Sequence, residues 1–109
     1  MEILSKEQIV MELIVNSGDA RSKAMGAIKI AKKGDLQAAR AKIKEANEAL
    51  NKAHNIQTSL IQGEAAGEEF QINLLMIHAQ DHLMNAITVK ELAEEFIALH
   101  KRVEEKVTV

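Results

Sequence analysis

Two histidines and an aspartate stand inside the most apolar stretch of the chain, at residues 78–84 (HAQDHLM). At about 100° per residue in a helix, Asp81 and His82 flank His78 on opposite sides, so the three side chains form one connected patch. An imidazole accepts and releases a phosphoryl group readily near pH 7, because its ordinary pKa of about 6.5 leaves a lone pair free. We therefore take His78 as the candidate nucleophile.

The sequence around His78 leaves two roles open for the neighbouring His82. His82 follows one helical turn later, where it either supports a phosphate or the tautomer of His78, or is simply satisfied inside the fold. The nearest later basic residue is Lys90, so no cation within two turns would trap a phosphate. The pair also has the spacing of zinc helices, but Ala79 stands where the H-E-x-x-H protease pattern needs glutamate, which disfavours zinc hydrolysis.

The composition indicates aliphatic helix packing in a single domain. The 109 residues include no proline, tryptophan or tyrosine and only two phenylalanines, whereas 47% are hydrophobic. We predict an all-α domain spanning residues 1–109. The absence of cysteine excludes disulfides, a thiol nucleophile and a cysteine-type zinc site.

The charge pattern disfavours nucleic acid and membrane as direct partners. The net charge is −2, lysines and glutamates are interspersed, and few aromatic residues are present to stack on bases. No apolar run is long enough to span a bilayer, and the first residues lack the apolar run of a signal peptide. We expect a cytoplasmic protein without membrane insertion.

Capping signals predict the first two helices. Residues 5–8 (SKEQ) have the form of a capping box, so the first helix should begin near Lys6. Gly34 supplies a left-handed stop and Asp35 an N-cap for the next helix. In that second helix, the apolar series from Leu36 to Leu60 alternates steps of three and four residues.

The third helix is predicted from near Glu69 to about Val103, after a turn at residues 62–68 and before a frayed end at 104–109. Short turns between consecutive helices predict an antiparallel up-down-up three-helix bundle. The residues expected to face the bundle core are Ile72, Leu75, Ala79, His82, Ala86, Val89, Ala93 and Phe96.

A second apolar stripe on the third helix predicts self-association. Leu74, Ile77, Asp81 and Met84 project roughly 90° to 190° away from the core-facing series. Three helices cannot wrap one of their own number, so this stripe needs a cover from another copy. We expect a closed homotrimer.

Asp81 lies in the middle of this stripe, so a cyclic assembly would gather one carboxylate from each subunit near the axis. Like charges there require shared protons or a hard cation held by carboxylate oxygens and water. We favour a divalent metal, Mg²⁺, shared between the subunits of a trimer. The alternative is a solvated aspartate on an exposed helix face.

The same residues resemble a known family. The chain is similar, over essentially all 109 residues, to the IIA component of the lactose/cellobiose class, which includes N,N'-diacetylchitobiose, of the bacterial phosphoenolpyruvate-dependent sugar phosphotransferase system. Three segments carry the resemblance: residues 18–23 (GDARSK), 53–58 (AHNIQT) and above all 78–84. The resemblance implies a homotrimer of three-helix bundles in which Asp81 corresponds to a shared metal-binding aspartate.

The resemblance also implies a reaction. His78 would accept a phosphoryl group on Nε2 from the histidine-containing phosphocarrier protein and pass it to a cysteine of the IIB component, with Gln80 and His82 in support. The IIC membrane permease would then couple this phosphate to uptake of a β-disaccharide. Ala79, where lactose-type members carry glycine, favours cellobiose or chitobiose, with lactose still open.

Two other functions fit parts of the pattern. The outer stripe could bind a foreign helix, which would make the chain a helical scaffold or adaptor with a metal- or pH-sensitive histidine patch. A metal-dependent hydrolase could use His78, Asp81 and His82, although no further ligand or general base has recognisable spacing. Light scattering distinguishes the adaptor from the phosphocarrier, since a monomer favours the adaptor and a trimer favours the phosphocarrier.

Overall fold

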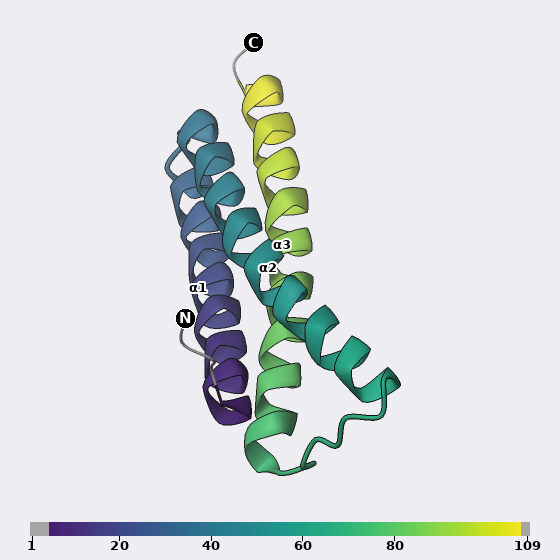
Figure 1. The fold of residues 1–109 in the computed structure, drawn as a ribbon. Helices are drawn as coiled ribbons and strands as arrows, with labels where there is room; N and C mark the ends of the chain where they lie inside the picture. Colours follow the sequence, from purple (N-terminus) through teal and green to yellow (C-terminus); the bar gives the residue numbers. More distant parts are fainter. Residues whose placement is uncertain (1–4, 108–109) are drawn as a thin grey trace.

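Three long α-helices form the protein. The computed structural model describes residues 5–107, which form α1 (Lys6–Lys32), α2 (Leu36–Ala65) and α3 (Leu74–Val107) and contain no β-strand. Helices α1 and α3 run in one direction and α2 in the other (Figure 1). The predicted all-α, up-down-up three-helix architecture is therefore confirmed. Within residues 5–107, no helix has both the length and the apolarity to cross a membrane.

Local capping sets the start of α1 and the connection to α2. The Ser5 hydroxyl accepts from the Gln8 backbone amide at 3.2 Å, and the Gln8 side chain accepts from the Ser5 amide at 2.8 Å. Gly34 has a φ of +90°, which glycine adopts without the penalty of a Cβ atom. The Asp35 carboxylate then accepts from the Ala38 amide at 3.1 Å. All three predicted signals are confirmed.

Alanine dominates the interior of the bundle. Because the alanine side chain is a single methyl group, helices that meet through it approach one another closely. Leu13 and Leu83 are the two large hydrophobic residues with no exposed surface. The buried alanines are Ala20, Ala24, Ala27 and Ala31 on α1, Ala39, Ala46, Ala49 and Ala53 on α2, and Ala79, Ala86 and Ala93 on α3.

The connection between α2 and α3 differs from the prediction. Helix α2 continues through Gly63 to Ala65, where a turn was expected, and ends beside Gly67, whose φ is +95°. Residues 68–73 are not helical, so α3 begins at Leu74 rather than near Glu69. The Asn73 side chain accepts from the backbone amide of the third residue of α3 at 2.9 Å and so caps this later start.

A lysine from the start of α1 explains why this segment is extended. The Lys6 ammonium donates to the Glu69 carbonyl at 2.5 Å, lies 3.8 Å from the Glu68 carboxylate, and sits 4.6 Å from the centre of the Phe70 ring. These contacts connect residues 68–70 to the N-terminal end of α1, and Phe70 also packs against the core. A long-range contact thus overrides the local helical tendency of the two glutamates.

The inner face of α3 is rotated relative to the prediction. Ala79, Ala86 and Ala93 are buried as expected, and Leu75 and Val89 are half-buried. However, Ile72 is 80% exposed and Phe96 45% exposed, whereas Leu83 and Ile97 fill the interior and His82 is only half-buried. Ile72 precedes the helix. The large buried residues follow the buried alanines by four positions, as Ile97 follows Ala93, whereas the prediction took the residue three positions on, Phe96. Both spacings fit one helix face, and packing against the other helices decides between them.

Helix α3 continues through Val107, so the predicted helix end near Val103 is wrong, whereas the fraying expected at residues 104–109 stays a prediction. The Glu104 carboxylate lies against the α1–α2 turn, only 3.0 Å from where a Cβ on Gly34 would stand. This contact holds the last turns of α3 against the bundle. Residues 1–4 and 108–109 of the predicted domain lie outside the described part of the chain.

Candidate functional site

The first turns of α3 form the platform for the candidate site. Helix α3 begins at Leu74, so His78 lies in its second turn and His82 in its third. Ala79 and Leu83, each next to one of the histidines, are fully buried and fix the rotation of the helix about its axis. The predicted platform is therefore a rigid helical surface whose orientation is set by core packing.

The structure brings the two histidines together. Their ring centroids are 4.4 Å apart and the ring planes meet at 84°, which is an edge-to-face contact. His78 is exposed and His82 is half-buried. The His78 ring is therefore open to a partner from outside, while its orientation is restricted by a neighbouring ring.

Asp81 lies next to this pair in sequence but faces away from the bundle. It is exposed, and it forms no ion pair with any other residue between 5 and 107. The same part of the chain contains no group of three histidine, cysteine, aspartate or glutamate side chains that could hold a metal ion. A single chain therefore offers one carboxylate here.

This finding also bears on the hydrolase alternative. A hydrolytic zinc site requires three protein ligands around one ion, and His78, Asp81 and His82 do not form such a group in the described chain.

Gln80 is held on the other side of α3. Its side-chain oxygen accepts from the Gln57 amide at 2.8 Å, and its amide nitrogen donates to the Met76 sulfur at 3.6 Å. These bonds direct Gln80 toward α2, away from His78 in the same chain. The sequence analysis did not predict that Gln57 would position Gln80.

No cation approaches the histidines along α3. Lys90, the nearest later basic residue, binds Glu94 at 2.9 Å. Neither histidine takes part in an ion pair within residues 5–107. Along α3, the nearest later ammonium group is thus already engaged by a carboxylate.

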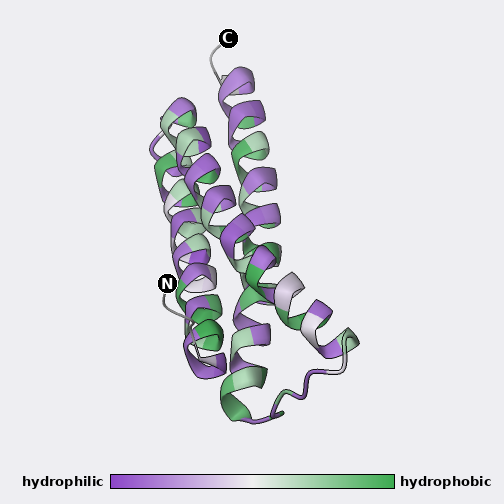
Figure 2. Cartoon of the chain, viewed as in Figure 1, coloured by the Kyte–Doolittle hydropathy of each residue, from purple (hydrophilic) through white to green (hydrophobic). Residues whose placement is uncertain are grey.

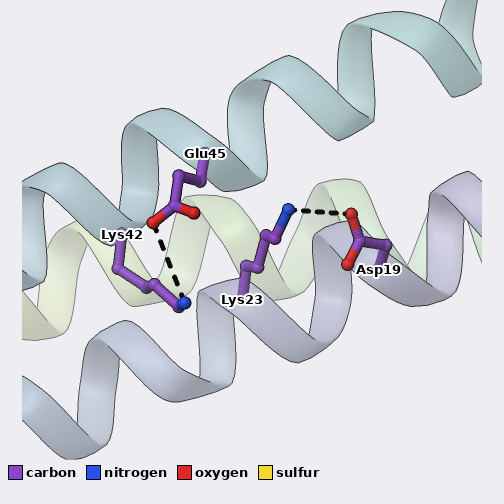
Figure 3. Close-up of polar contacts among 4 residues, drawn as sticks. All are labelled: Asp19, Lys23, Lys42 and Glu45. Carbon is purple, nitrogen blue, oxygen red and sulfur yellow. Dashed lines mark hydrogen bonds and ion pairs between the residues drawn. The ribbon is translucent and has the colours of Figure 1, made fainter.

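The segment 18–23 lies elsewhere, on the part of α1 whose Lys23 lies close to the charges of α2. Lys23 binds Asp19 one turn earlier at 2.9 Å, and Lys42 on α2 lies 3.7 Å from Glu45 (Figure 3). The hydrogen bond with Asp19 raises the pKa of Lys23, and the charge of Glu45 adds to this effect. These exposed pairs form a polar surface and contribute no group to the histidine patch.

The outer stripe of α3 is confirmed as exposed and extends further than predicted. Leu74 is 81%, Ile77 56% and Met84 54% exposed, and Figure 2 shows hydrophobic residues at the beginning of α3, at the periphery of the bundle. The stripe continues along the second half of the helix through Leu92, Phe96, Leu99 and Val103, each at least 45% exposed. Their spacing of four, three and four residues was the signal that could have revealed this continuation.

Comparison with known proteins gives consistent matches along the chain. Residues 8–101 match the family described as "PTS system, Lactose/Cellobiose specific IIA subunit". The lichenan-specific phosphotransferase enzyme IIA component of Bacillus subtilis is 53% identical over 100 residues, which cover 92% of this chain and 91% of the relative.

Solved structures agree with the fold. The crystal structure of the cellobiose-specific enzyme IIA from Bacillus anthracis has a TM-score of 0.91 at 55% identity, and the match covers 95% of this chain and 96% of the other. The IIA(Chitobiose) protein in a solution structure of its complex with HPr, from Escherichia coli, has a TM-score of 0.82 at 44% identity, with 94% and 99% covered.

Proposed function

The chain belongs to the lactose/cellobiose-specific IIA family of the sugar phosphotransferase system, and on this premise we propose that His78 is the residue that carries the phosphoryl group. The single observation that supports this choice best is the placement of His78, exposed on the rigid α3 platform and in contact with a second imidazole. The other histidines, His54 and His100, have no such ring contact with any residue between 5 and 107. His78 is thus the histidine best arranged for repeated loading and unloading.

The proposed reaction moves one phosphoryl group between proteins. The Nε2 lone pair of His78 attacks phosphorus while the bond from phosphorus to the donor histidine breaks, and the donor nitrogen keeps that electron pair. In the second step a cysteine thiolate of the IIB component attacks the same phosphorus, and Nε2 of His78 leaves with its electrons. Docking of the two proteins in line supplies most of the rate, through positioning and charge stabilisation.

His82 is proposed to position the His78 ring. The edge-to-face contact at 4.4 Å limits rotation of the His78 side chain, which keeps Nε2 directed outward. Of the two roles that the sequence left open for His82, we therefore favour support of His78 over a histidine that is simply satisfied inside the fold. Gln80 is bound to Gln57 in the same chain, so any support it gives would reach a histidine of a neighbouring subunit.

The partners follow from the family. The histidine-containing phosphocarrier protein is proposed as the donor, which is supported by the structure of a 44% identical relative bound to HPr. The IIB component is proposed as the acceptor, and the IIC permease as the indirect destination, with the carrier acting in the cytoplasm. The similar proteins include ones named for lichenan, cellobiose and chitobiose and others named for galactose and lactose. We favour a β-linked disaccharide of the cellobiose or chitobiose type, with lactose still open.

The assembly is proposed to be a homotrimer with Asp81 near its axis. The outer stripe leaves large apolar side chains, Leu74 and Ile77 among them, more than half exposed in the single chain, and burying them requires further copies. Each chain contributes one unpaired carboxylate to that surface. Three such carboxylates would suit a divalent cation of the Mg²⁺ type, which prefers oxygen ligands and retains several waters.

The scaffold or adaptor alternative has no support in the comparisons, which all concern phosphotransferase proteins. It would be restored only if the purified chain were monomeric and failed to accept phosphate.

The experiment that tests the function is reconstitution with phosphoenolpyruvate, the two general phosphotransferase proteins and this chain. We expect the wild-type mass to increase by one phosphoryl group and that of His78→Ala to remain unchanged, with equal helicity by circular dichroism. His54→Ala is the matched control, because it also removes one exposed histidine, and it should be phosphorylated like wild type. If the His78→Ala variant is phosphorylated, His78 is not the phosphoryl acceptor.

A further inference from the structure

The contact between His78 and His82 brings together two potential metal ligands. The residues are four apart on a continuous helix, and both rings lie on the same side of α3. Neutral imidazole is the commonest protein ligand for Zn²⁺ and related transition-metal ions. The arrangement therefore has a chemical capacity separate from phosphoryl transfer, for which a single imidazole suffices.

We propose that His78 and His82 form a two-imidazole chelate for a transition-metal ion such as Zn²⁺, and that the bound ion blocks His78 as a phosphoryl acceptor. The blocking of His78 rests on the proposed function, whereas the metal site rests on the geometry of the two histidines alone. The class of ligand is a borderline-soft divalent cation that prefers nitrogen. It differs from the hard, oxygen-preferring cation proposed for Asp81.

The distances require only a small adjustment. With Zn–N bonds of about 2.0 to 2.1 Å, two imidazoles on one tetrahedral ion have centroids about 5 Å apart. The rings are now 4.4 Å apart in an edge-to-face arrangement. Rotation about the side-chain bonds of the exposed His78 would open this contact and turn one nitrogen of each ring toward a shared ion, while the helix backbone stays in place.

The electrostatic surroundings allow a cation. Neither ring is engaged in an ion pair within residues 5–107, and the nearest later cation on the helix, Lys90, is bound to Glu94. Asp81, adjacent to His82 and itself without an ion-pair partner in that range, adds a negative charge close by. A divalent ion would therefore meet the attraction of Asp81, whereas Lys90 lies about two helical turns beyond His82 and is engaged by Glu94.

The site would be open and its occupancy reversible. The described chain holds no group of three metal-binding side chains, so two histidines leave the remaining coordination positions to water. An ion held by two protein ligands exchanges more readily than one in a closed structural site. Because the metal and the phosphoryl group need the same lone pair of His78, each excludes the other.

The test of the site is titration of the unphosphorylated protein with ZnCl₂, followed by isothermal titration calorimetry. We expect one ion per chain in the wild type. His78→Ala and His82→Ala should each weaken binding by at least the roughly tenfold to hundredfold seen when even an outer partner of a metal site is lost. His54→Ala and His100→Ala, which remove isolated histidines, should bind like wild type. Equal affinity in all five proteins would overturn the proposal.

A second measurement separates the metal site from the phosphoryl acceptor. The rate of phosphoryl transfer from the purified phosphorylated donor is measured with and without Zn²⁺, and each protein is compared with its own zinc-free rate. Zinc should slow wild type markedly and leave the ratio for His82→Ala near one, which also controls for effects of zinc on the donor. If zinc binds through both histidines but transfer to wild type is unaffected, the blocking role is refuted, whereas failure of His78 as the acceptor would show instead as phosphorylation of His78→Ala.

Discussion

The two faces of α3 contrast in what covers them. On the inner face, Ala79, Leu83 and Ala86 have no exposed surface because α1 and α2 pack over them. On the outer face, side chains of similar apolarity, such as Leu74 and Ile77, are more than half exposed. One face of α3 is therefore buried within the chain, whereas the apolar side chains of its other face can be buried only by another molecule. The histidine patch lies between them, rigidly supported from inside and accessible from outside.

We expect the largest effect from a charge placed on the outer face of α3. Ile77→Asp should dissociate the proposed trimer, because an unpaired carboxylate buried between subunits costs more than about 3 kcal/mol. Helicity should be retained, since Ile77 is 56% exposed in the single chain. Sedimentation velocity would show monomers. A variant that sediments as a trimer would move the subunit interface away from this stripe.

A matched pair of truncations separates the faces. Leu83→Ala removes a side chain with no exposed surface, whereas Leu92→Ala makes the same change at a side chain that is 52% exposed. We expect Leu83→Ala to lower the free energy of unfolding by about 2 to 5 kcal/mol because it leaves a cavity. Leu92→Ala should act mainly on assembly, and its effect on unfolding should therefore depend on protein concentration. Chemical denaturation at two concentrations measures both.

The outer face also contains the one charge that the proposed assembly must accommodate. Asp81→Leu should give an oligomer at least as stable as wild type, with a gain of about 1 to 4 kcal/mol, because repelling carboxylates are replaced by apolar groups. Its thermal stability should no longer respond to MgCl₂ or to a chelator, whereas that of wild type should. Dissociation of the Asp81→Leu variant into monomers would contradict the assignment of Asp81 to the axis.

The smallest expected effect concerns the interior. Ser17 on α1 has no exposed surface, and its hydroxyl finds no hydrogen-bond partner among residues 5–107. Ser17→Ala should therefore raise the free energy of unfolding by roughly 1 kcal/mol, because it removes an unsatisfied buried polar group at little cost in volume. Thermal denaturation followed by circular dichroism measures this. A lower melting temperature would reveal a role for the hydroxyl that the fold of one chain does not show.

The sequence predicts features whose causes are local. The α1–α2 turn follows from Gly34 and Asp35, which act on their immediate neighbours, and it is confirmed. The α2–α3 connection depends on Lys6, which binds Glu69 across 63 positions of sequence. No local pattern contains that contact, and the predicted start of α3 was therefore wrong.

The candidate site divides in the same way. Contact between His78 and His82 follows from a separation of four residues on a helix and is observed. The bond from Gln57 to Gln80 joins two helices, and spacing within one helix does not reveal it. The inner face of α3 was misplaced because steps of three and four residues both fit one helix face, and contacts with the other helices select Ile97 rather than Phe96.

The most direct test of the central claim is localisation of the phosphoryl group in the wild-type protein. Cleavage after glutamate, at a pH that preserves phosphohistidine, separates His54 in residues 49–64 from His78 and His82 in residues 70–91 and from His100 in residues 96–104. Electron-transfer fragmentation then distinguishes His78 from His82. We predict phosphate on the 70–91 peptide and on His78 alone, whereas phosphate on His82, His54 or His100 would contradict the account.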